Sequence, residues 1–501
     1  MRSYATFFII AVMTFGLVFM LVTRDRSKHE APAEVIEPKP TLAGDAGAGG
    51  PDAGTADAAA LAPADGGAPQ AEKPIRVTSL GWELVAAGAA LTPPAGADAA
   101  APSPSFELAP ESSLEAIEAR LARGGADPQG ADIAVLPLPA FIASYERLRA
   151  LEPRAFLVVG FSHGREEVRA APNALLKPPP AADEVKLVAL GPETATDATA
   201  RASGSESATV LGLFALDLLG VAPSRIRLVA AGSPDAKAAP FAAVVRGAAD
   251  ERPRAFSTAD ASRLVPIVAV APKALIDAHE ATVREWSKSW LDGLSRAKAD
   301  VPGVARRLAA KEALPLASGV GGAPEALVLV ERLGQIENTG LDQQTSLIGP
   351  LAKGPATLDV LTQRTWQVAR GGGITAAAAP DPLPIDARIV STIAPPPKEL
   401  PAPAVGEGDG GVTFGPLPSG AVPMVAYRAV DGDADKVASQ IAFLATVFER
   451  GVFKITAKGG DKAAKAIATA ARDKGVAASR LATASGEPLG AFAAVEVLSP
   501  P

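Results

Sequence analysis

The chain has 501 residues, with 48 basic and 55 acidic side chains and a formal net charge of −7 at pH 7. An acidic chain without a basic cluster argues against nucleic-acid binding. Cysteine is absent, which excludes disulfide bonds, thiolate metal sites and cysteine nucleophiles, and His29, His163 and His279 are too far apart in sequence to suggest a metal cluster, so we expect no metal and no cofactor.

The first apolar segment covers residues 4–22 and contains no charged side chain. As a helix it is just long enough to cross a hydrocarbon core of about 30 Å. A cleaved signal peptide is the alternative, but its apolar region is usually shorter and ends in small residues, whereas Arg24, Asp25 and Arg26 follow this one. We therefore expect an uncleaved single-pass transmembrane anchor. The flanking charges favour a cytoplasmic bulk, although long domains are often translocated regardless.

Two segments have the composition of linkers. Residues 29–74 consist mostly of Ala, Gly, Pro and Asp, and residues 395–422 are similar. Neither segment has enough bulky apolar side chains to offset the entropy lost on ordering. We expect both to be disordered, the first as a tether for a domain at 75–394 and the second as a connection to a small unit at 423–501.

Between the linkers, short apolar runs alternate with amphipathic segments. Helices are expected at 112–123, where Ser112 and Glu115 would form a capping box, at 205–219, and at 275–294, where Trp286 and Trp290 would face the core. Strands are expected at 75–80, 132–138, 155–160, 185–190, 225–230 and 266–270. This alternation is typical of an α/β fold with a parallel, doubly wound sheet.

The segment at 202–220 has the clearest chemical interest. A turn of small polar residues, with hydroxyls at Ser203, Ser205 and Ser207 and a flexible backbone at Gly204, leads directly into an apolar helix. The free N–H groups of a first helical turn can bind an anion such as a sulfonate, carboxylate or phosphate. The alternative is that Ser205 only caps the helix. Glu206, in the same turn, would repel an anion if it faced the pocket.

Two further positions follow apolar strands, where α/β proteins place ligands. Trp82 comes after the strand at 75–80 and would either line a pocket or pack in the core. Arg165 comes after the strand at 155–160 and would either pair with an anionic ligand or lie on the surface beside Glu166 and Glu167. No glycine-rich nucleotide motif and no Ser/His/Asp constellation is evident.

Residues 75–395 resemble the nitrate/sulfonate/taurine class (SsuA-like) of periplasmic solute-binding proteins of ABC transporters. The matching pieces are GADIAVLPLPAFIAS at 130–144, the segment at 202–247, which begins ASGSESATVLGLFALDLLG, and VPIVAVAPKALIDAHEATVREWSKSWLDGL at 265–294. The resemblance implies a two-lobed Venus-flytrap fold of the type II periplasmic-binding-protein class. The first lobe would span about 75–184 and 257–394, and the second about 185–256.

The same resemblance implies a function. The ligand would lie between the lobes, in contact with Ser203, Gly204, Ser205 and Ser207 of the second lobe and Trp82 of the first. It would be a small anionic solute passed to an ABC transporter permease. The bulk of the chain would face the periplasm from the inner membrane.

Residues 423–501 resemble a degenerate OmpA-like domain. The segment FKITAKGGDKAAKAIATAARDKGVAASRLATASGEP at 453–488 is similar to the family's strand–helix–strand core. Asp461 corresponds to the aspartate that binds peptidoglycan in the family, but Ala463 stands where an arginine is expected, which favours a structural role.

Three functions follow. The first is a membrane-tethered solute-binding protein without enzymatic activity. The second is a cell-envelope protein whose flytrap has lost its ligand and whose C-terminal unit contacts peptidoglycan. The third, an enzyme like the thiamine-pyrimidine synthases of the same fold, is disfavoured because those enzymes use a cysteine cluster.

Overall fold

The computed structural model describes residues 73–91, 105–190, 205–246, 248, 250–310, 326–349, 352, 354–394, 414–488 and 490–501. The expected transmembrane segment at 4–22 lies outside these residues, as do nearly all of the first linker and residues 395–413 of the second. Within the described ranges, no helix is long and apolar enough to span a bilayer. The chain from Pro69 to Pro501 forms one unit by its internal contacts.

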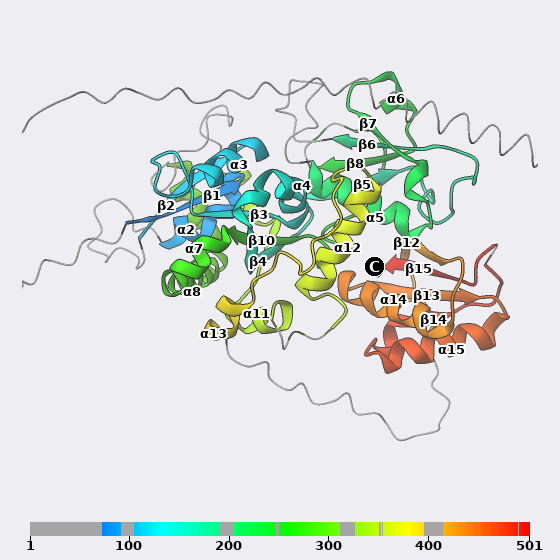
Figure 1. The fold of residues 1–501 in the computed structure, drawn as a ribbon. Coiled ribbons are helices and arrows are strands. Elements are labelled where there is room, and N and C mark those ends of the chain that lie inside the picture. The colour runs from blue at the N-terminus through cyan, green and yellow to red at the C-terminus, as the bar shows by residue number, and fades with distance from the viewer. Residues whose placement is uncertain are drawn as a thin grey trace, which may run out of the picture. The chain divides into compact units, whose positions relative to one another are not determined.

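Three β-sheets organise the described residues (Figure 1). The strands are β1 (Ile75–Leu80), β2 (Phe106–Glu111), β3 (Ile133–Pro137), β4 (Arg154–Ser162), β5 (Glu166–Ala170), β6 (Val185–Leu190), β7 (Ile226–Ala230), β8 (Phe241–Val245), β9 (Arg254–Ser257), β10 (Pro266–Ala271), β11 (Ile336–Asn338), β12 (Val422–Ala429), β13 (Val452–Ala457), β14 (Leu481–Thr483) and β15 (Ala493–Ser499). The α-helices are α2 (Ala86–Leu91), α3 (Leu114–Arg123), α4 (Leu138–Leu148), α5 (Glu206–Leu218), α6 (Pro234–Ala238), α7 (Lys273–Ala278), α8 (Glu280–Ala299), α9 (Val301–Ala309), α10 (Ala326–Leu333), α11 (Leu341–Leu347), α12 (Leu358–Gly371), α13 (Arg388–Ile393), α14 (Ala434–Val447) and α15 (Gly460–Asp473).

The first lobe is built on a six-stranded sheet of order β11-β4-β10-β3-β1-β2. β1 pairs in parallel with β2 and β3, whereas β10 runs antiparallel to both β3 and β4. Strands β3 and β10 are buried along their whole length because helices and other strands cover both faces, which explains their uninterrupted apolar sequences.

The second lobe is built on a five-stranded sheet of order β7-β6-β8-β5-β9. β6 pairs in parallel with β7 and β8, and β5 runs antiparallel to β8 and β9. Five strands of the first-lobe sheet follow the same order: three parallel strands, one antiparallel strand that arrives from the other lobe, and one further strand. The first lobe then adds β11 at its edge. The expectation of two α/β lobes is confirmed, but both sheets are mixed rather than wholly parallel. Because β5 belongs to this sheet, the second lobe begins near Glu166 and not at 185.

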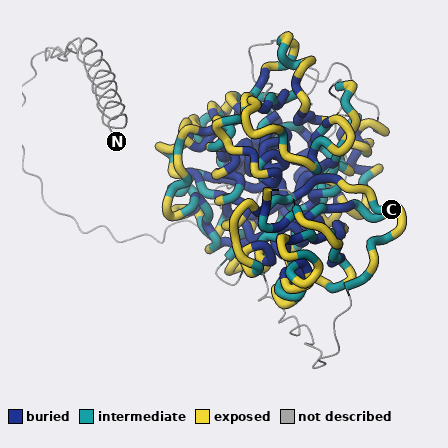
Figure 2. Tube along the Cα trace, turned by 90° about the vertical axis from the view of Figure 1, so that its right-hand side faces the viewer, coloured by how far each residue is buried: buried dark blue, intermediate teal, exposed yellow. Residues whose placement is uncertain are grey.

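Aromatic packing fills the core of the first lobe, and Figure 2 shows buried chain running through the middle of the described part. Trp286 and Trp290 are fully buried and stack with ring centroids 4.9 Å apart. This agrees with the core role expected for them, but the expected helix at 275–294 is two helices, α7 and α8, because the backbone departs from helical geometry at His279. The cap of α3 also differs: Ser113, not Ser112, accepts the N–H of Ala116.

The C-terminal unit, residues 422–501, has a four-stranded sheet of order β12-β15-β13-β14 with helices α14 and α15. The expected strand–helix–strand element is present as β13, α15 and β14. Helix α15 contacts α14, β13 and β14, whereas β12 contacts β9 and α5 of the second lobe. The unit is therefore packed on the body through one side.

Candidate functional site

Two short crossovers connect the lobes. Residues 163–165 lead from β4 to β5, and residues 258–265 lead from β9 back to β10. The crossovers are bonded to each other at both ends: the N–H of Ser162 donates to the carbonyl of Val265 at 2.9 Å, and that of Thr258 donates to the carbonyl of Glu166 at 2.9 Å. Two adjacent crossovers form a hinge about which the lobes can rotate.

A buried carboxylate lies at this hinge. Glu166 is 1% exposed, and its Oε2 accepts hydrogen bonds from the hydroxyls of Ser162 and of Thr258, the latter at 3.2 Å. Burial raises the pKa of Glu166 above its ordinary value, while the nearby charge of Arg165 and these hydroxyls act in the opposite direction. The group thus links the last residue of β4, the first residue of β5 and the second crossover.

Arg165 extends from the first crossover to the turn after β1. Its Nη1 lies 3.3 Å from Oε1 of Glu83, and its Nε lies 3.9 Å from Oε1 of Glu166. Glu83 is largely buried because its carboxylate folds over Gly81, which has a φ of 92° and where a Cβ would be 2.8 Å from Oε2 of Glu83. The positive φ favours glycine here. Two carboxylates therefore neutralise Arg165 within the protein.

Trp82 is next to Glu83 in the 3₁₀ turn η1 (Trp82–Val85) and is 3% exposed. Its Nε1 makes no hydrogen bond with any described group, as is also true of Trp286 and Trp290 in the core. Hence the unpaired indole does not by itself distinguish a binding residue from a packing residue. The position of Trp82 beside the hinge is what separates it from the other two.

The serine-rich turn is described only in part. Ser203 and Gly204 lie outside the described residues, whereas Ser205 occupies the N-cap of α5 and Ser207 its first turn. Both serines are buried, but the Ser205 hydroxyl makes no capping hydrogen bond. Side-chain capping therefore does not explain why a serine stands at this position. Glu206 contributes to the raised pKa of Arg147, whose main cause is the hydrogen bond to Glu118.

The expected binding residues Trp82 and Ser205 lie on elements with different neighbours. The main neighbours of η1 are β1, β2, β3, α2 and α10, all in the first lobe. Those of α5 are β5, β6 and β8 in its own lobe, together with α4, α12 and β12. The contact of Trp82 and the serine turn with one ligand stays a prediction.

Two cavities lie where the C-terminal unit meets the hinge. One of about 280 Å³ is lined by Phe161, Arg263 and Glu449 among other residues. The other, of about 650 Å³, is lined by residues that include His163, Lys298 and Glu449. Of the predicted binding residues that the structure describes, Trp82, Ser205 and Ser207, none lines either cavity.

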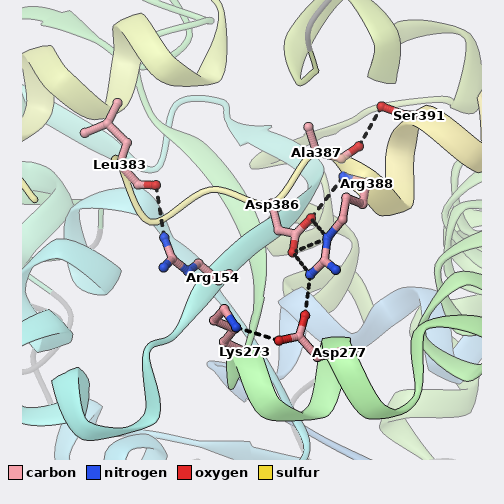
Figure 3. Close-up of polar contacts among 8 residues, drawn as sticks. All are labelled: Arg154, Lys273, Asp277, Leu383, Asp386, Ala387, Arg388 and Ser391. Atoms are coloured by element: carbon pink, nitrogen blue, oxygen red, sulfur yellow. Dashed lines mark hydrogen bonds and ion pairs between the residues drawn. The ribbon is translucent and has the colours of Figure 1, made fainter. Parts of the chain in front are cut away.

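A separate charged cluster lies at the start of β4 (Figure 3). Arg388 bonds Asp386 and Asp277, with Nη2 2.6 and 2.7 Å from their oxygens, and Lys273 bonds Asp277 at 2.6 Å. The charges of its two cations and two carboxylates cancel. These contacts, with the β-bridge between Ala155 and Ile385, hold the segment before α13 against β4. The cluster therefore has a structural role.

Asp461 lies in the first turn of α15 and is half exposed. It pairs with Lys465 at 2.8 Å and accepts the Thr483 hydroxyl at 3.3 Å. The hydrogen bond from Lys465 is the main reason that the pKa of Asp461 is lowered. Among the described residues, no group of histidine and carboxylate side chains is suited to hold a metal ion.

Comparison with known proteins gives distant likenesses. No family model matches the chain, and no curated protein sequence matches it. A zinc-bound ligand-binding component of an ABC-type import system from Staphylococcus aureus is similar at 11% identity and a TM-score of 0.39, over 64% of this chain and 99% of that one. The aliphatic sulphonate binding protein SsuA from Escherichia coli is similar at 12% and 0.37, over 66% and 94%.

The nitrate-binding protein NrtA from Synechocystis PCC 6803 is similar at 11% identity and a TM-score of 0.30, over 47% of this chain and 66% of that one. At these identities and scores the likenesses assign no ligand and no activity to this chain.

Proposed function

We propose that the body of this protein, residues 75–394, binds a small solute between its lobes and presents the closed form to an ABC transporter permease. The observation that carries the proposal is the pair of lobes whose sheets share a five-strand order, joined by two adjacent crossovers that are hydrogen-bonded to each other. Such a hinge lets two rigid lobes close on a ligand. No catalytic constellation or cofactor site is part of the proposal.

The solute we propose is a small anion of the nitrate, sulfonate or taurine kind. The buried N-terminal turn of α5, with Ser205 and Ser207, supplies N–H groups and a partial positive charge. Ser203 and Gly204 precede it, and Trp82 would close the site from the first lobe. The segment at 4–22 would tether the protein to the inner membrane with its bulk in the periplasm.

Intrinsic fluorescence of the full chain in detergent, titrated with nitrate, taurine and small carboxylates, tests the proposal. We expect a saturable change with one of these anions and at least about tenfold weaker binding in Ser207→Ala, which removes a buried hydroxyl. Ser439→Ala, an exposed hydroxyl on α14, is the matched control and should bind as the unaltered chain does. A folded protein that responds to none of the anions overturns the proposal.

A second candidate is a cell-envelope interaction protein whose lobes no longer bind a solute. One observation favours it: Arg165, the cation of the first crossover, already forms ion pairs with Glu83 and Glu166. The C-terminal unit would then supply the contact with peptidoglycan through Asp461. Co-sedimentation of the full chain with purified peptidoglycan, compared with Asp461→Ala and the control Asp473→Ala, tests this; the absence of sedimentation in the unaltered chain contradicts it.

A further inference from the structure

We infer that the C-terminal unit is a brace that joins the two lobes across the hinge and restricts their rotation. The inference goes beyond the proposed function and holds whether or not the lobes bind a solute. It depends on three separate contact areas, which lie on the second lobe, on the second crossover and on α12.

The contact with the second lobe is aromatic. Phe443 of α14 meets Phe214 of α5 edge-on with centroids 6.3 Å apart, and Phe448 packs on Phe256 of β9 at 5.8 Å. Phe214, Phe256 and Phe448 are each no more than 1% exposed. A backbone hydrogen bond from Ala426 of β12 to the carbonyl of Leu175 adds to this area at 2.9 Å. Buried aromatic contacts of this kind make a stable attachment.

This attachment explains a feature of α5. The helix is apolar on all sides, with eleven of its thirteen residues buried. Such a helix needs cover on every face. The sheet of the second lobe covers one side, and α4, α12 and β12 cover the rest. Without the C-terminal unit part of this apolar surface would be exposed to water.

The contact with the hinge centres on Arg263, in the second crossover. Its Nε donates to Glu449, just after α14, at 2.9 Å, and its Nη2 donates to Glu337 of β11 at 2.7 Å. The guanidinium also lies over the ring of Phe161 in β4, 4.8 Å from the centroid. The Ser262 hydroxyl donates to the same Glu449 at 3.1 Å. One residue of the crossover thus connects the C-terminal unit to the sheet of the first lobe.

The third area lies on α12. Arg364 of this helix lies over the ring of Phe443, 6.0 Å from the centroid, and its Nη2 donates to Asp217 of α5 at 2.6 Å. Helix α12 is attached to α4 of the first lobe, where Trp366 meets Tyr145 at 5.1 Å. Phe443 therefore contacts Phe214 of the second lobe and Arg364 of α12, a helix that packs on both α4 and α5.

Rotation of the lobes about the crossovers must change at least one of these areas, because the C-terminal unit is fixed to all three at once. The brace therefore favours the arrangement of lobes seen here, and weakening it should release other arrangements.

Pulsed EPR between spin labels on the two lobes measures the distribution of distances between them directly. The chain has no native cysteine, so Ala281→Cys on α8 and Ala238→Cys on α6, both exposed alanines, give unambiguous labels.

The full chain in detergent, without added solute, is the sample, so the outcome is independent of solute binding. In Glu449→Ala and in Phe443→Leu we expect a broader distance distribution, with other lobe arrangements about tenfold more populated in each. Asp461→Ala is the matched control, because its carboxylate is 47% exposed against 46% for Glu449 but pairs with Lys465 on the outer helix. It should leave the distribution unchanged.

Unchanged distributions in both variants overturn the inference. The same holds if circular dichroism shows that Phe443→Leu unfolds the C-terminal unit while the distance between the lobes stays as it was. A broadening that appears equally in Asp461→Ala also overturns it, because that carboxylate does not contact the body.

Discussion

Arg165→Gln tests the electrostatics of the hinge. The substitution removes the cation that lies 3.3 Å from Glu83 and 3.9 Å from Glu166, and the exposed fractions of the three side chains are 14%, 10% and 1%. Removing one partner of a buried pair costs about 3–5 kcal/mol. Because the contact with Glu166 is long, we expect a loss of stability at the lower end of this range, about 3 kcal/mol at neutral pH.

The cost should depend on pH, because burial raises the pKa of Glu166 and Arg165 is the strongest influence that lowers it. A carboxyl whose pKa is raised on folding contributes its full stability below the unfolded pKa and loses it as pH rises through the folded pKa. Without Arg165 the pKa of Glu166 rises further. The loss of stability in Arg165→Gln should therefore shrink as pH falls, since a protonated Glu166 needs no counter-charge.

Urea unfolding of the full chain, followed by circular dichroism at pH 7.5 and pH 5, measures both effects. In Arg165→Gln/Glu166→Gln most of the pH dependence of the loss should disappear, because the titrating group is gone. Arg165→Lys keeps the cation and should cost less than the glutamine variant. A loss in Arg165→Gln that is equal at both pH values, or larger at pH 5, refutes the reasoning.

Three further changes test the packing. Gly293→Ala should lower stability by about 1–3 kcal/mol, because the new Cβ would lie 2.5 Å from the carbonyl oxygen of Ala87. An unchanged thermal midpoint would show that α2 and α8 are not in such close contact. Trp290→Ala should cost about 3–5 kcal/mol by removing the stack on Trp286, and a loss below about 1 kcal/mol in urea unfolding would contradict its core placement. Arg388→Ala should lower stability by about 1–3 kcal/mol, because Asp386 is only 9% exposed and would lose its ion-pair partner. An unchanged unfolding midpoint would contradict this.

Local patterns predicted several of the apolar strands but missed β8, with sequence FAAVV, although it is buried along its whole length. The runs at 75–80 and 185–190 are strands with those bounds, because an apolar run between turn residues has few other stable placements. Strand β2, with sequence FELAPE, was not expected, because it is a half-exposed edge strand that contains Pro110. Strand order is set by pairing between distant segments, which a local pattern does not encode, and so the repeated order of the two lobes was not apparent.

The hinge cluster shows why part of the candidate site was missed. Strand β5 has the sequence EEVRA, and its charges made a surface turn the natural interpretation. In the structure Glu166 accepts hydrogen bonds from Ser162 at the end of β4 and from Thr258 in the second crossover. Glu167 pairs with Arg169 at 2.9 Å, so these carboxylates have partners inside the fold. A charged run directly after a wholly apolar strand was the available signal. The position of Trp82 just after β1 was predictable from the end of the apolar run at 75–80. The position of Ser205 at the start of α5 was predictable because serine commonly precedes a helix.

A thermal-shift screen of the full chain in detergent, against nitrate, sulfonates, taurine and small organic acids, tests directly whether the lobes bind a small anion. A ligand at a hundred times its dissociation constant should stabilise the protein by about 2.7 kcal/mol. We expect such a shift with at least one anion, and a smaller shift in Ser205→Ala and in Ser207→Ala. A cooperative unfolding transition that no anion moves would contradict solute binding and leave the envelope-interaction function as the better account.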